Sequence, residues 1–309
     1  MPVPPPVVLT IAGFDPSCGA GVTADIKAIA AHECYGVACI TALTVQSTRG
    51  VRRVQAVDPG IIAATLEDLA SDFAIAAVHI GMLGNEQVVG TVADFLEQAR
   101  LPHVVLDPIL KSTSGADLLN PAGTRQIVER LFPLAELVTP NLDEAAALAG
   151  MPLVNTAVAS AATASATPGA ASLSSSVDAM REAARRLHSL GAANIVVTGG
   201  DLERAVDLLS FTNNGRVEQE VFKAERQRST STHGTGCAFA TALACHLANG
   251  RGLPEAVLLA KVYVSAAIAN SQPLGHGAGP LHHLYRMTEQ RRPNQIISEQ
   301  EHARSHSRN

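Results

Sequence analysis

The 309-residue sequence contains no tryptophan, and aromatic residues make up only 3% of it. Binding of single-stranded nucleic acid depends on rings that stack with the bases, so the composition does not favour that function. Positive charge is also scarce, because 23 basic residues stand against 28 acidic ones and give a net charge of −5. A nucleic acid or an anionic membrane would require a basic surface. We therefore expect neither as a partner.

The five cysteines form an odd number and include no Cys-x-x-Cys motif. A disulfide framework and a zinc knuckle are therefore not indicated, and reduced thiols are expected. No run of about 18 apolar residues is free of charges and turn residues, as a membrane span would require. The proline-rich start also lacks the charged segment that is typical of a signal peptide. The sequence thus predicts a cytoplasmic protein without a membrane span.

Short runs rich in Val and Ile alternate with segments of helical periodicity along most of the chain. This alternation predicts an α/β fold with a central, mostly parallel β-sheet and helices on both faces. An Asn-Gly turn near residue 214 predicts an antiparallel hairpin. The expected strands and hairpin cover residues 7–12, 37–43, 76–80, 104–106, 137–139, 195–197 and 204–222. The expected helices cover residues 21–32, 59–71, 86–100, 121–131, 143–149, 177–190, 236–248 and 254–270.

Two segments have compositions that do not favour a packed core. Residues 155–176 are almost all Ala, Ser, Thr, Pro and Gly, which predicts a flexible surface insertion. Residues 287–309 are polar and are expected to form a disordered tail. The sequence therefore predicts one domain over residues 1–286, interrupted by the insertion.

A glycine-rich segment after the first expected strand contains Gly19 and Gly21 and matches the G-x-G-x-x-G/A dinucleotide fingerprint. The first glycine lies seven residues past the strand, however, and residues 39–41 lack the acidic side chain that would hold a ribose. A nicotinamide site is therefore disfavoured. Either a turn that folds over a small ligand or glycines required by turn geometry alone would explain the segment.

A second glycine-containing segment, His233 to Cys237, leads into an apolar helix. The Walker A motif and the protein-kinase signatures are absent, which excludes those two phosphate-binding architectures. Glycines at a helix start let backbone N–H groups converge on an anion, and the helix dipole adds about half a positive charge. Such a site suits a transferring phosphoryl group, although an ordinary N-cap with Thr235 as the capping hydroxyl explains the pattern equally well. The same setting predicts a lowered pKa for the Cys237 thiol.

Oxygen ligands follow two of the expected strands. Asn141, Asp143 and Glu144 come after one strand, and Asp107 comes after its predecessor. The carboxyl ends of parallel strands share one edge of a sheet, where ligands bind. Such ligands suit Mg²⁺, which keeps several waters and bridges to phosphates. Taken alone, the Asn141 segment is explained as well by a helix N-cap with acidic residues in the first turn.

Three other positions are candidates for ligand contacts. Gln46 ends a strand and offers both a donor and an acceptor to a heterocycle, although a surface glutamine in a turn is the default interpretation. Met82 lies between glycines and is interpreted as a pocket residue. His282 and His283 lack a third partner at metal-binding spacing, which favours capping or packing roles.

Together these motifs resemble the ribokinase-like superfamily and, within it, the hydroxymethylpyrimidine/phosphomethylpyrimidine kinases of thiamine biosynthesis. The resemblance follows the family order through residues 9–21, 24–27, 40–46, 80–83, 105–108, 139–145, 233–237 and 279–283. It implies a helix-flanked, mostly parallel sheet and a single site for two reactions. These are the ATP- and Mg²⁺-dependent phosphorylation of 4-amino-5-hydroxymethyl-2-methylpyrimidine, and then of its monophosphate to the diphosphate. A homodimer is common in the family and is expected here.

The resemblance also implies roles for individual residues. Those expected to line the pyrimidine pocket are Gln46, Asp25, Gly13 and Met82. Those expected to organise Mg²⁺ and the phosphates are Asn141, Glu144 and Asp107. The anion hole would consist of Gly234, Thr235 and Gly236, followed by Cys237 where sugar kinases carry an aspartate base. The expected nucleotide contacts are Thr198, Gly200 and Lys111.

The sequence departs from the family pattern at three positions. Thr198 replaces a lysine of many members, Lys111 lies two positions earlier than its counterpart, and Phe14 occupies a place often held by Ser or Thr. Two other functions fit the pattern less well. One is a pyridoxine or pyridoxal kinase on the same fold. The other is a ligand-binding module without turnover, which would not need both a metal site and an anion hole.

Overall fold

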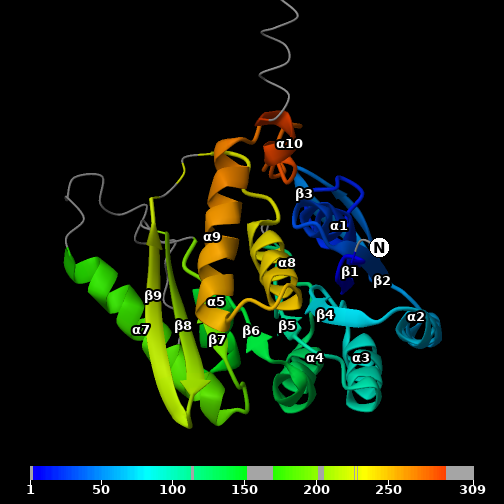
Figure 1. Ribbon diagram of the computed structural model, residues 1–309, viewed down its shortest axis with the longest axis horizontal. Helices are drawn as coiled ribbons and strands as arrows, with labels where there is room; N and C mark the ends of the chain where they lie inside the picture. The colour runs from blue at the N-terminus through cyan, green and yellow to red at the C-terminus, as the bar shows by residue number, and fades with distance from the viewer. Residues whose placement is uncertain are drawn as a thin grey trace, which may run out of the picture.

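The computed structural model describes residues 3–112, 115–151, 170–200, 205–225, 227 and 229–289. In this part of the chain one sheet contains nine strands in the order β3-β2-β1-β4-β5-β6-β7-β8-β9 (Figure 1). The strands are β1 (Val7–Phe14), β2 (Tyr35–Ser47), β3 (Gly50–Ala56), β4 (Ile75–Ile80), β5 (Val104–Leu106), β6 (Leu137–Val138), β7 (Ile195–Val197), β8 (Ala205–Asn213) and β9 (Arg216–Ala224). The six strands from β2 to β7 in this order pair in parallel, whereas β3, β8 and β9 are antiparallel.

Helices cover both faces of the sheet (Figure 1). One face carries α1 (Gly21–Ala31), α8 (Thr235–Ala248) and α9 (Leu253–Ala269). The other carries α2 (Pro59–Asp72), α3 (Glu86–Ala99), α4 (Pro121–Gln126), the π-helical η1 (Ile127–Leu131), α5 (Leu142–Leu148) and α7 (Ala170–Ser189). The short η2 (Phe132–Leu134) and α10 (Tyr285–Glu289) complete the described elements. None of the described helices is both long enough and apolar enough to cross a membrane.

Each central strand contributes to two separate cores. In β5, Leu106 packs among the helices of the α3 face and Val105 packs among those of the α8 face. Successive side chains of a strand point to opposite faces, so a strand buried on both sides is apolar throughout. This explains the continuous Val and Ile runs in the sequence. The same alternation places Asp107, two residues after Val105, on the α8 side of the sheet.

The observed elements agree closely with the predicted ones, except that β3, η2, α10 and the first turns of α7 were not predicted. Strand β3 is not among the expected strands, because Arg52, Arg53 and Gln55 interrupt any apolar run. Its pairing with β2 defines it instead. Residues 170–176 of the predicted flexible insertion are the first turns of α7. Residues 152–169 lie outside the described part, so the predicted insertion stays a prediction. Of the expected tail, residues 287–289 end α10, and the remainder also lies outside it.

Candidate active site

The carboxyl ends of β5, β6 and β7 bring three predicted site residues to one edge of the sheet. The ladder continues past the strands, with the Thr139 N–H donating to the Leu106 carbonyl and the Thr198 N–H donating to the Pro140 carbonyl, both at 2.9 Å. Asn141 and Thr198 form an isolated parallel bridge. Asp107, Asn141 and Thr198 therefore follow one another across adjacent strand ends, as the order of the motifs predicts.

Helix α8 begins beside this edge with a glycine as its N-cap. Gly234 has φ of +79° and, having no side chain, contributes no capping hydrogen bond to the first N–H groups. Thr235 is the first helical residue, so the interpretation of Thr235 as the capping hydroxyl was wrong. A Cβ atom built on Gly236 would lie 3.8 Å from Oδ2 of Asp107. The start of α8 thus lies next to the carboxylate of Asp107.

The first glycine segment packs directly on the second. A Cβ atom on Gly234 would lie 2.1 Å from the Gly19 carbonyl oxygen, and one on Gly21 would lie 2.1 Å from the Gly13 carbonyl oxygen. Gly21 also has a positive φ, of +60°. Glycine is needed here because two backbones approach each other too closely for a side chain. Of the two interpretations left open, the structure favours glycines required by geometry.

Gly234→Ala is expected to destabilise the protein more than Gly215→Ala. Both positions need a positive φ, of +79° and +75°, which costs an alanine about 1 kcal/mol. Only at Gly234 would the new Cβ also overlap another backbone, since no atom of the described residues lies within 4 Å of a Cβ on Gly215. Urea unfolding of both variants measures the difference. Equal losses would contradict the close contact between the two loops.

Cys237 differs from the prediction. Burial raises the pKa of its thiol well above the ordinary range, and the carboxylates of Asp107 and Asp25 raise it further. The backbone N–H of Gly21 hydrogen-bonds to the sulfur and lowers the pKa, but by less. The predicted lowered pKa was therefore wrong, because desolvation and two nearby negative charges outweigh the helix start. Cys237 is a neutral thiol at neutral pH.

Asp107 is buried, with 4% of its surface exposed. Burial raises its pKa from 3.8 to about 6; His79 lowers the pKa, and the negative charge of Asp25 raises it. A buried carboxylate with a raised pKa at a sheet edge is typical of a functional site.

The raised pKa predicts how Asp107→Asn changes stability with pH. Between about pH 4 and 6 the folded protein holds a proton that the unfolded chain releases, so Asp107 weakens folding as the pH rises through this window. In Mg²⁺-free buffer, Asp107→Asn is expected to raise the free energy of unfolding by about 1–3 kcal/mol at pH 7.5. Little gain is expected at pH 4. Urea titrations at the two pH values measure this, and an equal effect at both would contradict it.

Asp25 lies behind the site and has no accessible surface. It accepts hydrogen bonds from the hydroxyls of Thr10 at 2.7 Å and Thr241 at 2.9 Å, and it lies 3.4 Å from Nδ1 of His79. The resemblance placed Asp25 on the wall of the pocket, whereas here it belongs to a buried polar cluster between β1, β4, α1 and α8. His79 was not predicted, although a histidine within an apolar strand is a detectable signal.

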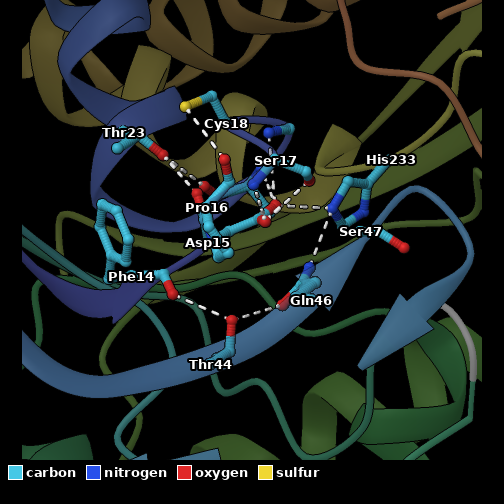
Figure 2. A network of polar contacts seen from close by, with 12 residues as sticks. Phe14, Asp15, Pro16, Ser17, Cys18, Thr23, Thr44, Gln46, Ser47 and His233 are labelled. Atoms are coloured by element: carbon cyan, nitrogen blue, oxygen red, sulfur yellow. Dashed lines mark hydrogen bonds and ion pairs between the residues drawn. The ribbon is translucent and has the colours of Figure 1, made fainter. Parts of the chain in front are cut away.

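Gln46 lies beside His233. The sequence marks His233 only as the first residue of the segment that leads into α8. Figure 2 shows the network around them. Nε2 of His233 lies 2.9 Å from Oδ2 of Asp15 and 3.1 Å from the Gln46 side-chain amide. Gln46 and His233 line a cavity of about 350 Å³, together with residues 47–51, Ser112 and residues 276–278. Asp15 and His233 are the residues here that sequence reasoning missed.

Gly13 and Met82 adjoin each other, but neither is among the residues that line this cavity. A Cβ atom on Gly13 would lie 3.0 Å from Sδ of Met82. Met82 packs with Ala42 and Leu118 in a small apolar cluster separate from the two main cores. Such a cluster at the ligand edge of the sheet is consistent with an apolar wall for a ring.

The predicted metal ligands Asn141 and Glu144 form a capping box at the start of α5. The Asn141 side chain accepts from the Glu144 N–H at 2.8 Å, and the Glu144 carboxylate accepts from the Asn141 N–H at 3.0 Å. Among the described residues, no three His, Cys, Asp or Glu side chains form a metal-binding group. Two carboxylates, Asp107 and Glu144, still match Mg²⁺, which retains waters and binds through phosphates.

The nucleotide candidates follow two different strands of the sheet, with Lys111 after β5 and Thr198 and Gly200 after β7. Lys111 is exposed and lies 3.4 Å from Asp117 in an ion pair. Among the described residues, which do not include 201–204, no atom lies within 4 Å of a Cβ on Gly200. Beneath it, the Gly199 N–H donates to Oδ1 of Asp207, whose Oδ2 accepts from the buried Nζ of Lys261 at 2.5 Å. Sequence reasoning missed this buried ion pair, because its members lie on β8 and α9, outside every motif.

Solved structures share this fold. Pyridoxal kinase from Bacillus subtilis, solved with ADP, has a TM-score of 0.76 and 32% identity, covering 92% of this chain and 99% of that one. Phosphomethylpyrimidine kinase from Clostridium difficile has a TM-score of 0.69 and 31% identity, covering 85% and 99%. The fold and the site together define a small-molecule kinase of the ribokinase-like class, as predicted.

Sequence comparison gives the family. The phosphomethylpyrimidine kinase family model matches residues 15–174 and 167–282. Hydroxymethylpyrimidine/phosphomethylpyrimidine kinase of Escherichia coli is 38% identical over 90% of this chain and 97% of its own. The bifunctional thiamine biosynthesis protein ThiED of Geobacter sulfurreducens is 40% identical over 92% of this chain, which spans only 53% of that protein. The chain belongs to the phosphomethylpyrimidine kinase family, which confirms the resemblance.

Proposed function

We propose that this protein transfers the γ-phosphoryl group of ATP to 4-amino-5-hydroxymethyl-2-methylpyrimidine, and then a second one to the resulting monophosphate. The observation that carries the proposal is the glycine start of α8 facing Asp107 across the sheet edge. Similarity to the E. coli kinase over nearly its whole length supports the same activity. The ADP complex of the B. subtilis neighbour supports an adenine nucleotide as the phosphoryl donor.

The backbone at the start of α8 is the main catalytic element of this proposal. Phosphoryl transfer has a loose transition state with charge spread over the equatorial oxygens, so positioning and electrostatic stabilisation supply most of the rate. The N–H groups of Thr235, Gly236 and Cys237 would stabilise that charge without reorganising. The Gly199–Gly200 segment, fixed from below by Asp207, would hold the nucleotide phosphates. Asp107 and Glu144 would hold Mg²⁺, which supplies charge neutralisation on the phosphates.

Cys237 would contact the acceptor as a neutral thiol. Because its pKa is raised, it does not act as a strong base at neutral pH. A loose transition state forms little bond to the nucleophile, so a strong base is not required for the first step. The second acceptor is an ionised phosphate, which needs little proton abstraction. The thiol therefore serves to place the acceptor in line.

Turnover assays with purified protein test the proposal. With ATP and Mg²⁺, the aminopyrimidine alcohol and its monophosphate should both be phosphorylated, and pyridoxal should be a poorer substrate. Faster turnover of pyridoxal would support the second candidate, which the B. subtilis and Staphylococcus aureus pyridoxal kinase structures favour. Binding of all three compounds without turnover would instead indicate a ligand-binding protein. The homodimer remains a prediction, which light scattering during size-exclusion chromatography tests.

A further inference from the structure

Asp15 is a buried carboxylate whose contacts are all with donors. Its Oδ1 accepts from the N–H of Ser17 at 2.8 Å and from the Ser17 hydroxyl at 2.7 Å. Its Oδ2 accepts from the Ala20 N–H at 3.0 Å and the Gly19 N–H at 3.3 Å, and lies 2.9 Å from Nε2 of His233. Burial raises the pKa of Asp15, but hydrogen bonds from His233 and Ser17 outweigh this and lower the pKa overall. Asp15 is thus an ionised acceptor, and the ring nitrogen that faces it must carry a proton.

The proton on His233 determines how the Gln46 amide must face. A protonated ring nitrogen can only donate, so it requires the amide oxygen, whereas Nε2 of Gln46 lies 3.1 Å from it (Figure 2). A half-turn about the last side-chain torsion exchanges the amide oxygen and nitrogen while conserving the shape. After that turn, the single Nε2–H of His233 is shared between Oδ2 of Asp15 and the amide oxygen of Gln46, and no donor faces a donor.

Thr44 independently requires the same turn. Its Oγ1 lies 3.0 Å from the Phe14 carbonyl oxygen and 3.1 Å from the Gln46 amide. A carbonyl oxygen only accepts, so the single hydroxyl proton of Thr44 is donated to Phe14. The hydroxyl oxygen must then accept from the amide nitrogen of Gln46. The hydrogen bonds to His233 and to Thr44 therefore require the same orientation of the Gln46 amide.

We propose that His233, held by Asp15, is a positioning residue that fixes which way the Gln46 amide faces the substrate. The proposal rests on the proposed function and adds the origin of its ring selectivity. The fixed amide leaves one oxygen lone pair and one N–H for a ligand. These complement a ring edge on which a nitrogen acceptor adjoins an exocyclic amino donor, as in an aminopyrimidine. On the reversed edge, a ring N–H lies beside an exocyclic carbonyl. Its N–H would face the N–H of Gln46 and its carbonyl would face the Gln46 oxygen, so neither hydrogen bond could form.

The His233 ring is well placed for this role. A Cβ atom on Gly19 would lie 2.3 Å from Cδ2 of His233, so the ring packs directly on the Gly19 backbone. Its side chain is 12% exposed, toward the cavity that it shares with Gln46. His233 also directly precedes Gly234, the N-cap of α8. One residue therefore joins the ring-recognition site to the start of the anion hole.

The test compares two substrates in one variant. His233→Phe keeps a ring of similar shape and removes its hydrogen-bonding nitrogens. The measured quantity is the ratio of kcat/KM for the 4-amino alcohol to kcat/KM for its 4-oxo analogue, which presents the reversed edge. This ratio is expected to fall about tenfold or more, the effect of one oriented hydrogen bond. An unchanged ratio, with both reactions slowed equally, would overturn the proposal.

Other variants separate orientation from folding. Thr44→Val removes the acceptor at the other end of the amide and should lower the same ratio, which decides the question if His233→Phe fails to fold. In a Gln46→Ala background, His233→Phe should leave the ratio unchanged. His103→Phe is the control, because His103 pairs with Glu136 and is not among the residues that line this cavity. A comparable fall in that control would contradict the role of His233. If the wild-type protein turns over neither compound, the proposed function fails, and the calorimetric binding ratio of the two rings still tests the orientation.

Discussion

Gly236→Ala should lower kcat by about 100-fold or more without lowering stability. A Cβ at this position would project toward Asp107, with its nearest contact at 3.8 Å, so the fold has room for it. The methyl group would occupy the space in which the transferred phosphoryl group must approach the N–H groups. Loss of one such donor contact costs about 10²–10³ in rate. Because alanine favours a helix by about 1 kcal/mol over glycine, the variant should be as stable as the parent or slightly more so.

Steady-state kinetics and urea unfolding of the same preparation check this prediction. Gly90→Ala is the matched control, since Gly90 also lies in a helix and a Cβ there would have ordinary contacts, the nearest at 3.5 Å. The control should gain similar stability and keep full activity. Parental activity in Gly236→Ala would contradict the use of the α8 backbone in phosphoryl transfer.

Lys261→Met should have the largest effect on stability. Lys261 and Asp207 form a buried ion pair, with side chains 9% and 8% exposed. Removing one member leaves the other charge buried without compensation, which costs about 3–5 kcal/mol. The Gly199 N–H also donates to Asp207, so the loop above the pair should loosen. We therefore expect the KM for ATP to rise severalfold, while the KM for the pyrimidine changes little.

Two further variants test the cause of that loss. Replacing both members, as Lys261→Met with Asp207→Leu, removes the unpaired charge and should recover much of the stability. It should not restore the KM for ATP, because Gly199 still lacks its acceptor. Arg251→Met breaks the exposed pair with Glu255 at the start of the same helix and should cost less than about 1 kcal/mol. Similar losses for Arg251 and Lys261 would contradict the importance of burial.

The sequence predicts the sheet and its helices well because burial on both faces leaves a local signal. Continuous apolar runs identify β1, β4 and β5, and the helical periods between them identify the crossovers. Strand β3 has no such run, since it lies at the edge and depends on pairing with β2. Where long-range pairing rather than composition determines an element, the pattern alone is insufficient.

The site is predictable to the extent that it follows strand ends and helix starts. Asp107, Asn141, Thr198 and Gly236 all satisfy such local rules. The predictions for Asp25 and Cys237 depend on how deeply a side chain is buried and on which charges surround it, and neither can be obtained from the sequence. Asp25 has no accessible surface, and burial together with two nearby carboxylates raises the pKa of Cys237.

The contact between the two glycine segments has a consequence for the order of folding. Asp15 and His233 are 218 residues apart in the chain. The anion-binding segment that begins at Gly234 is therefore synthesised long after the loop against which it packs. Contacts of such high sequence separation form late, because a large loop must close first. A nascent chain that ends before α8 contains all the parallel strands but lacks the α8 part of the proposed active site. Activity should therefore appear only after α8 has been synthesised and has packed on the Gly19 loop.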